Sequence, residues 1–155
     1  MTDRMRRLEA SDLDALVEIY RQAVLTSTDA FYTTAQQSAW ASQCEAIRPI
    51  LQRGQGFVSC NSSNQPMAFC LRDPADRIAL LYSHPAMQRS GLGGMLLAAC
   101  EDEASQQGVT CLRTEASLIS HVLFQARGWQ VSWREELLIA GVHFLRFRMQ
   151  KQLVH

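Results

Sequence analysis

The stretch QRSGLGG at residues 88–94 places three glycines at the start of a long predicted helix. Glycine is about 1 kcal/mol less favourable than alanine inside a helix, so three of them need a reason beyond helix formation. The first N–H groups of a helix have no partner within it and carry a partial positive charge, which makes them a natural site for an anion. Backbone without Cβ atoms lets a phosphate approach closely. The stretch therefore predicts a phosphate site formed by Gln88, Arg89, Ser90, Gly91, Gly93 and Gly94.

Glycine used only for the backbone angles of a tight turn is the alternative explanation of this stretch. Two known nucleotide motifs do not account for it. A P-loop requires GxxxxGK[ST], and its lysine is missing here. The GxGxxG fingerprint of dinucleotide-binding folds is also absent, together with the acidic residue that would bind a ribose. The sequence thus indicates a phosphate site of another kind.

Candidates for acid–base chemistry stand near this site. Tyr82 ends the apolar segment RIALLYS, and ligand sites of α/β sheets collect at the carboxyl ends of strands. We expect Tyr82 to act in catalysis or beside the acceptor, the alternative being a packed tyrosine with one satisfied hydroxyl. Glu115 ends another predicted strand, where it could take a proton through water or cap the helix that follows. His84 precedes Pro85 and is expected to order the turn.

Tyr32, Gln36 and Trp40 are candidates for binding the substrate. They fall at i, i+4 and i+8, so they share one face if the helix around them is continuous. Aromatic rings beside an amide can pack against a substrate and orient it. The alternative is a helix packed onto the sheet through Trp40.

The hydrophobic pattern predicts the elements that position these residues. Spacing of 3.6 residues indicates helices from residue 11 to 24 and from 92 to 107, whereas short apolar runs indicate strands such as 77–83 and 109–115. The predicted order is β, helices, β, β, β, α, β, α, β, β. The unit 77–115 is strand–turn–helix–strand with a right-handed crossover, and the other strands join by hairpins. The sequence therefore predicts an α/β fold with a mixed sheet.

Composition limits the class of protein further. A chain of 155 residues that is 47% hydrophobic and 19% charged is typical of one globular domain, so we expect a single domain over residues 1–155. Its 15 basic and 15 acidic side chains balance, which disfavours a nucleic acid or a membrane as partner. Five cysteines without metal-ligand spacing argue against zinc and any other metal. The N-terminus lacks an apolar signal and no run is long enough to span a membrane, which favours a cytoplasmic protein.

The motif QRSGLG resembles the Q/R-x-x-G-x-G/A motif of the GCN5-related N-acetyltransferases, the GNAT family. LLYSHPAMQRSGLGGMLL and GVTCLRTEASLISHVLFQARGW resemble the family's strand–turn–helix segment and the strand and helix that follow it, and FYTTAQQSAWA resembles the acceptor-side helix of one bacterial subgroup. The resemblance covers essentially the whole chain. It implies a mixed, mostly antiparallel sheet with splayed central parallel strands and flanking helices. It also implies transfer of an acetyl group from acetyl-CoA to a primary amine of a small molecule or peptide.

The resemblance assigns a role to the backbone on both sides of the turn. The amides of residues 88–94, Leu92 among them, would hold the pyrophosphate of acetyl-CoA. Leu81 and Ser83 would meet the pantetheine arm through their main-chain groups, as an added strand does. A backbone N–H near Tyr82 or Ser83 would polarise the thioester carbonyl.

The resemblance leaves the general acid unassigned. Many family members carry a tyrosine where Phe124 stands, and phenylalanine cannot donate a proton. Phe124 is expected either to pack against the pantetheine or thioester or to sit in the core. His121 would lie on the helix near the pantetheine, where it could shuttle a proton through water or be an exposed helix residue.

Two alternatives concern the activity and the assembly as a whole. No cysteine stands in an obvious nucleophile position, so the amine is expected to attack directly. Because a strong base is missing, a non-catalytic acyl-CoA-binding sensor or interaction module is the alternative function. The two C-terminal strands could pair across a homodimer or cap the sheet.

Overall fold

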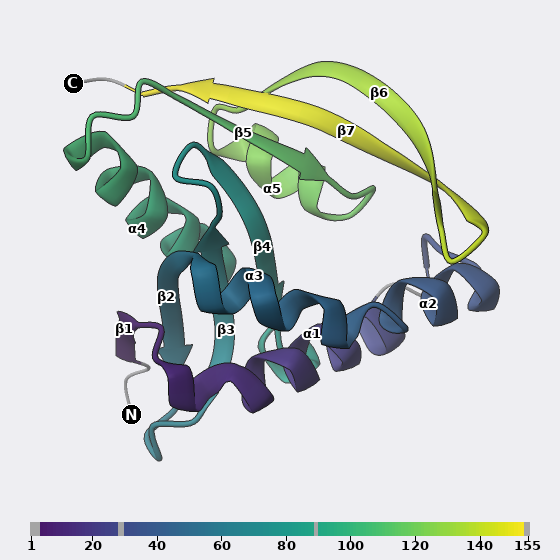
Figure 1. Cartoon of the computed structure of the whole chain (residues 1–155), viewed down its shortest axis with the longest axis horizontal. Coiled ribbons are helices and arrows are strands. Elements are labelled where there is room, and N and C mark those ends of the chain that lie inside the picture. Colours follow the sequence, from purple (N-terminus) through teal and green to yellow (C-terminus); the bar gives the residue numbers. More distant parts are fainter. Residues whose placement is uncertain (1–3, 28–29, 89, 154–155) are drawn as a thin grey trace.

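The structure is a computed structural model that describes residues 4–27, 30–88 and 90–153 (Figure 1). It contains one seven-stranded sheet with the order β1-β2-β3-β4-β5-β7-β6, in which only the β4–β5 pair is parallel. This arrangement confirms the expected α/β fold with a mixed, mostly antiparallel sheet. The strands are β1 (Arg4–Arg7), β2 (Gln55–Cys60), β3 (Pro66–Arg72), β4 (Arg77–Ser83), β5 (Cys111–Ala116), β6 (Gln130–Ile139) and β7 (Val142–Gln152).

Helices cover both faces of the sheet. Helices α1 and α3 pack with buried residues of β2, β3 and β4 in one apolar cluster, and α4 packs with the other face of β3, β4 and β5 in a second cluster, to which α5 adds Phe124. None of the described helices is long and apolar enough to cross a membrane. The helices are α1 (Leu13–Ser27), α2 (Thr34–Ala41), α3 (Ile47–Arg53), α4 (Leu92–Gln106) and α5 (Ser120–Ala126), with 3-10 turns η1 (Ala10–Asp12), η2 (Cys44–Ala46) and η3 (Pro85–Met87).

The parallel strands β4 and β5 separate soon after they begin. Their ladder contains two registered pairs, Arg77 with Arg113 and Ile78 with Thr114. On its other side β4 stays paired with β3 as far as Ser83. Figure 1 shows β5 continuing away from β4 toward the β6–β7 hairpin. The expected splay of the central strands is therefore present.

The splay leaves one edge of β4 without a neighbouring strand. The His84 N–H donates to the carbonyl of Met67 on the β3 side at 2.7 Å. Main-chain groups of successive strand residues point to opposite sides, so those of Tyr82 face β3 as well. Those of Leu81 and Ser83 consequently face the gap between β4 and β5. An extended ligand can pair with them there.

A buried ion cluster ties α4 to the sheet beneath it. Arg72 of β3 is fully buried and donates to Glu103 of α4 at 2.9 Å, to Gln107 at 2.7 Å and to the Ala75 carbonyl at 2.6 Å. Arg7 of β1 donates to the same Glu103 carboxylate. The Glu103 carboxylate thus supplies the negative charge for two guanidinium groups.

We expect Glu103→Ala to lower the free energy of unfolding by about 3 kcal/mol or more, because it leaves the buried Arg72 charge uncompensated. Urea unfolding at pH 7 measures this loss. Glu45→Ala, which removes an exposed partner of Arg48, serves as the control and should cost less than about 1 kcal/mol. A loss as small as that of the control would contradict the assignment.

The same cluster predicts a pH dependence. Burial raises the pKa of Glu103, but hydrogen bonds from Arg72 and Arg7 outweigh it and hold the pKa below its ordinary value of 4.5. The carboxylate therefore stabilises the fold fully above that pH and loses its contribution as the pH falls below it. The stability difference between wild type and Glu103→Ala should shrink over that acidic range.

Candidate functional site

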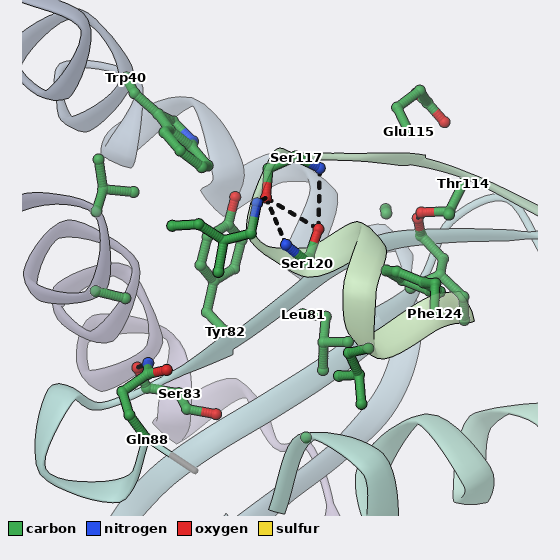
Figure 2. Close-up of a pocket in the computed structure, with 17 residues that line it drawn as sticks. Trp40, Leu81, Tyr82, Ser83, Gln88, Thr114, Glu115, Ser117, Ser120 and Phe124 are labelled. Carbon is green, nitrogen blue, oxygen red and sulfur yellow. Dashed lines mark hydrogen bonds between the residues drawn. The ribbon is translucent and has the colours of Figure 1, made fainter. Parts of the chain in front are cut away.

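Two adjoining cavities occupy the gap that the splay opens, and Figure 2 shows the first of them. The first, here called the cleft, has a volume of about 250 Å³ and lies along β4, β5 and α5. The second, here called the aromatic cavity, has a volume of about 170 Å³ and lies among α2, β4, β6 and β7. Because they share wall residues, the two cavities lie next to each other. The residues lining both are Trp40, Ala79, Tyr82, Glu115 and Ser117.

The unpaired edge of β4 forms one wall of the cleft. Leu81, Tyr82 and Ser83 all line it. The Ser83 carbonyl, which faces the gap, accepts a hydrogen bond from the Gln88 side-chain amide at 3.2 Å. Gln88 lines the cleft as well, so its side chain occupies a position where an extended ligand would pair with the strand.

The glycine turn meets the end of the cleft, and its glycines have different structural reasons. Gly91 precedes α4 with φ of +86°, and a Cβ there would meet nothing within 4 Å. The backbone angle therefore favours glycine, and the space around it is open. A Cβ on Gly93 would approach Leu123 of α5 to 3.2 Å, and one on Gly94 would lie 3.8 Å from the same side chain. These two glycines allow α4 and α5 to pack closely.

Ser90 and Leu92 of the turn make contacts within the protein. The Ser90 hydroxyl donates to the Met87 carbonyl at 2.6 Å, so it orders the turn before α4. Leu92 is buried beneath the helix start. Arg89 lies outside the described residues. The described backbone around Gly91 remains the open part of the expected phosphate site.

Tyr82 lies where both cavities meet. Its ring packs on Tyr20, with the ring centres 4.7 Å apart, and on Phe69 at 5.9 Å. Burial raises the pKa of the Tyr82 hydroxyl above its ordinary value, although a hydrogen bond with the Trp40 side chain lowers it in part. The hydroxyl is therefore protonated at neutral pH and suits a hydrogen-bond donor better than a base.

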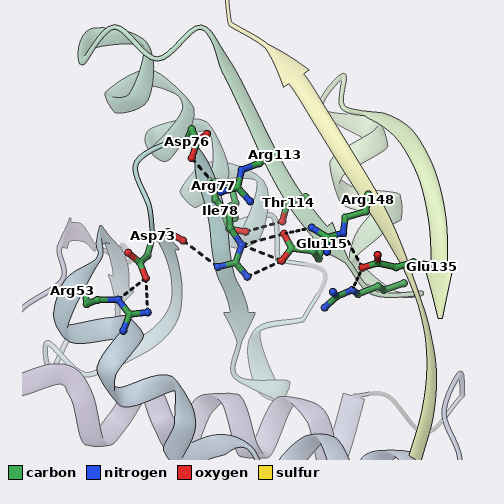
Figure 3. Close-up of polar contacts among 11 residues, drawn as sticks. Arg53, Asp73, Asp76, Arg77, Ile78, Arg113, Thr114, Glu115, Glu135 and Arg148 are labelled. Carbon is green, nitrogen blue, oxygen red and sulfur yellow. Dashed lines mark hydrogen bonds and ion pairs between the residues drawn. The ribbon is translucent and has the colours of Figure 1, made fainter. Parts of the chain in front are cut away.

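Glu115 lies in the wall between the cavities and is held by arginine (Figure 3). Arg77 donates to its carboxylate from Nε at 3.1 Å and from a terminal nitrogen at 2.8 Å. Arg148 lies 4.0 Å from the other side of the carboxylate. The described contacts do not show Glu115 capping α5. Hydrogen bonds between Ser117 and Ser120 close the turn before that helix instead. Glu115 is thus a fixed carboxylate that faces both cavities.

The two candidates on α5 have different surroundings. Phe124 is 2% exposed, packs edge-to-face on Trp129 with 4.9 Å between ring centres, and lines the cleft. It is a core residue and a cavity wall at once. His121 stacks on Phe147 with ring centres 4.3 Å apart, and its Nδ1 lies 3.2 Å from the Ser117 carbonyl. It is not among the residues that line either cavity.

The expected substrate-binding trio separates in the structure. Helix α2 begins at Thr34, after the N-cap Thr33, so it does not continue through Tyr32. Tyr32 and Trp40 nevertheless meet, with ring centres 5.2 Å apart, and both line the aromatic cavity. Gln36 instead bonds with Thr33 in a capping box and donates to the His143 carbonyl of β7 at 3.0 Å. The condition of one continuous helix is not met, because α2 begins after Tyr32, at the N-cap Thr33.

Several lining residues were missed by the sequence reasoning. Arg77 is the partner of Glu115, and Phe144 of β7 lies in the wall of the aromatic cavity. Ser117 and Ser120 line the cleft and are joined by hydrogen bonds. The SxxS spacing before a helix was a signal for the serines, whereas nothing local links Arg77 to Glu115. Among the described residues no group of three or more His, Cys, Asp or Glu could hold a metal ion.

Comparisons with known proteins agree on one family. A family model described as an acetyltransferase (GNAT) domain matches residues 17–152. A crystal structure from Rhodopseudomonas palustris, described as a GCN5-related N-acetyltransferase and class-II aminotransferase, is 26% identical with a TM-score of 0.89, over 99% of this chain and 97% of that chain. A search of curated proteins found no match.

Two more distant structures share the fold. The PaiA N-acetyltransferase from Thermoplasma acidophilum, in complex with coenzyme A, is 17% identical with a TM-score of 0.72, over 98% of this chain and 99% of that chain. A phosphinothricin acetyltransferase of the GNAT superfamily from Sinorhizobium meliloti, in complex with acetyl-CoA, is 20% identical with a TM-score of 0.69, over 99% of this chain and 89% of that chain.

The site predicts the ionisation of the tyrosines. The chain has three, Tyr20, Tyr32 and Tyr82, and burial raises the pKa of each above the ordinary value of 10. We expect absorbance at 295 nm to show less tyrosinate in the folded protein than in the unfolded chain at pH 10, where an exposed tyrosine is about half ionised.

The unfolded chain in guanidinium chloride is the control, and it should titrate three tyrosines near pH 10. Because the folded pKa values are raised, folding should lose stability as the pH rises above 10. One tyrosine equivalent ionising below pH 10 in the folded state would contradict the burial of these side chains.

Proposed function

The chain belongs to the GNAT acetyltransferase family, and we propose that it acetylates a primary amine of a small molecule or peptide by direct attack of that amine on acetyl-CoA. It is an acetyl-CoA-dependent acyltransferase. We assign this activity to one domain over residues 1–155. The observation that carries the proposal is the meeting of two cavities around five shared residues where β4 leaves β5.

The cleft fits the thioester substrate. A pantetheine arm carries amide groups, and the main-chain groups of Leu81 and Ser83 face the gap in which it would lie. The side chain of Gln88 must then release the Ser83 carbonyl. The pyrophosphate would lie on the backbone from Gln88 to Gly94, at the N-terminus of a helix of 15 residues. Phe124 would form the apolar wall beside the arm.

The aromatic cavity fits the acceptor. Tyr32, Trp40, Tyr82 and Phe144 give it apolar walls, and an aromatic face attracts an ammonium group as well as an apolar substrate body. An ammonium must lose a proton before it attacks, and Glu115 in the shared wall can accept that proton through water. Gln36 supports this cavity by fastening α2 to β7.

The remaining steps are assigned to the end of β4. The hydroxyl of Tyr82, kept protonated by burial, can donate a hydrogen bond to the reacting carbonyl. His121 stays a prediction as a proton shuttle, and its stack on Phe147 supports a structural role. Placing the amine beside the thioester supplies much of the rate by itself.

A homodimer stays a prediction as well. β6 is an edge strand of the sheet, and its Val131 and Trp133 side chains are exposed. An unpaired strand edge with apolar side chains favours pairing with another strand. These features support pairing of the C-terminal hairpin across a dimer.

We expect acetyl-CoA and CoA to raise the melting temperature, and ATP and NAD to leave it unchanged. Gly91→Ala should weaken acetyl-CoA binding on the order of tenfold, or about 1.4 kcal/mol, because a Cβ enters the open space before α4. Gly108→Ala is the matched control, since Gly108 has the same φ of +86° and open surroundings at the other end of α4.

Both glycine variants therefore carry the same backbone strain, and only Gly91→Ala should lose affinity in calorimetry. Equal losses in the two variants would show that strain, and not phosphate contact, is the cause. No stabilisation of the wild type by either CoA species would overturn the cosubstrate assignment.

Thiol release with a panel of amines, polyamines, amino acids and peptides tests the catalytic proposal. We expect release with at least one primary amine, and at least a tenfold lower kcat for Tyr82→Phe, which loses a donor to the reacting carbonyl. Tyr20→Phe is the control, because the Tyr20 hydroxyl donates to the Trp40 carbonyl and lines neither cavity. Binding of acetyl-CoA without thiol release across the panel would favour the sensor alternative.

A further inference from the structure

A network of ionised side chains joins β4, β5, β6 and β7 beside the aromatic cavity (Figure 3). Arg77 donates to Glu115 at 2.8 Å, and Arg148 lies 4.0 Å from the same carboxylate. Arg148 also donates from Nε to Glu135 at 2.8 Å, and Arg146 donates from Nε to the same Glu135 oxygen. The network therefore runs from the wall that both cavities share to the C-terminal hairpin.

The network carries more positive than negative charge. Its members within the described chain are three guanidinium groups and two carboxylates. The acidic side chains beside it are engaged elsewhere: Asp73 pairs with Arg53 at 2.9 Å, and Asp76 with Arg113 at 3.5 Å. One positive charge of the network is thus left without a carboxylate of its own among the residues that the structure describes.

Arg146 is the member with donors to spare. Its Nε is engaged by Glu135, whereas no described residue accepts a hydrogen bond from its two terminal nitrogens. Arg77 differs, because Nε and both of its terminal nitrogens donate to Glu115 or to the Asp73 carbonyl. The planar fork of a guanidinium matches the two oxygens of a carboxylate. The terminal nitrogens of Arg146 can therefore bind a carboxylate that the protein itself does not supply.

Arg146 holds this position in the wall of the aromatic cavity. It follows Phe144 by two residues on β7, and both line the cavity. Alternate residues of a strand lie on one face of the sheet, so the ring and the guanidinium are neighbours. The Arg146 side chain is 29% exposed, and partial shielding from water strengthens a charged hydrogen bond.

Glu115 gives the same cavity a negative group in another part of its wall. It lines the cleft as well, so it marks the side on which the thioester would lie. Glu135 and Arg148 stand between Glu115 and Arg146 in the network, so these two charges do not neutralise each other. The cavity thus presents a carboxylate toward the cleft and a guanidinium on the side of the hairpin.

A small zwitterion matches these surroundings. Its ammonium group would meet Glu115 and the aromatic faces, its carboxylate would meet Arg146, and an apolar body would contact Trp40 and Phe144. The cavity volume of about 170 Å³ lies below the 300–1,000 Å³ or so that drug-sized ligands occupy, which favours a small acceptor. A polyamine has no carboxylate and would meet the excess positive charge.

We propose that the acceptor is a free amino acid with an apolar side chain and that Arg146 binds its carboxylate, an assignment that rests on the proposed function. Glu115 takes the ammonium proton through water and releases it to solvent. As the C–N bond forms and the C–S bond breaks, the nitrogen loses a second proton and the sulfur gains one. The products are the N-acetylamino acid, the free thiol of CoA and one proton, so atoms and charge balance.

Matched acceptors test the carboxylate contact in the wild-type chain. Thiol release is compared for leucine, leucinamide and 3-methylbutylamine, and for the same three forms of methionine and of phenylalanine. In at least one set, kcat/KM for the amino acid should exceed that for both partners at least tenfold, or about 1.4 kcal/mol, because both lack the negative charge. The amide is less basic than the amino acid and the simple amine is more basic, so amine basicity does not explain a preference over both.

Arg146→Gln tests the assignment to this residue. It should lower kcat/KM for the amino acid at least tenfold, and leave kcat/KM for the amide and the KM for acetyl-CoA within about threefold of wild type. Arg134→Gln is the matched control: it removes the same charge from an exposed position of β6 that lines neither cavity, and should keep the preference. Melting temperatures of both variants report on folding.

Two results would overturn the carboxylate site. One is a wild-type kcat/KM for every amino acid no more than about threefold above that for its amide. The other is an equal loss for amino acid and amide in Arg146→Gln, which would mean that the arginine only supports the cavity wall. Thiol release with amides or simple amines alone overturns this inference and leaves the proposed function standing. Absence of thiol release with every acceptor overturns both.

Discussion

The early end of the β4–β5 ladder is the constraint on which the rest of the structure depends. The strands form two parallel pairs and then separate. The fold must therefore hold β4 and β5 together as far as the Ile78–Thr114 pair and keep them apart beyond it. Side chains brace the last pairs: Thr114 donates to the Ile78 carbonyl, and Arg77 joins the Glu115 carboxylate to the Asp73 carbonyl (Figure 3). Buried backbone groups left unpaired are costly, and the edge of β4 beyond Ile78 is open to an extended group that can pair with it.

The order of helices and strands could be predicted from the sequence, because hydrophobic period and turn residues are local signals. The hydrogen bond from the Leu118 N–H to the Tyr32 hydroxyl could not, since these residues stand 86 positions apart and meet only when the segment before α2 reaches the turn before α5. The ion pair of Glu115 is similar, because no local pattern says which arginine faces it. The start of α2, by contrast, has a local signal. Thr33 and Gln36 have the spacing of a capping box, which predicts the observed helix start.

The glycine turn shows how one motif can serve several physical needs. Gly91 adopts a backbone angle that other residues resist, while Gly93 allows Leu123 of α5 to pack against α4. Both needs are structural, and they coexist with an open helix N-terminus that suits an anion. The composition of the turn could not distinguish the backbone angle, the helix packing and the anion site, because each of them favours glycine. The geometry separates them and leaves Gly91 as the glycine beside open space at the start of α4.

The aromatic cavity is assembled from distant parts of the chain. Trp40 and Tyr32 come from the region of α2, whereas Phe144 comes from β7, and the Gln36–His143 hydrogen bond that joins these parts spans 107 positions. The cleft is built from β4, β5, α5 and the start of α4, with Ala23 and Val24 of α1 and Trp40 of α2 in its wall. Substitutions in β6 or β7 can therefore change the walls of the aromatic cavity without altering any residue that lines the cleft. The C-terminal hairpin thus shapes one cavity and leaves the lining of the other unaltered.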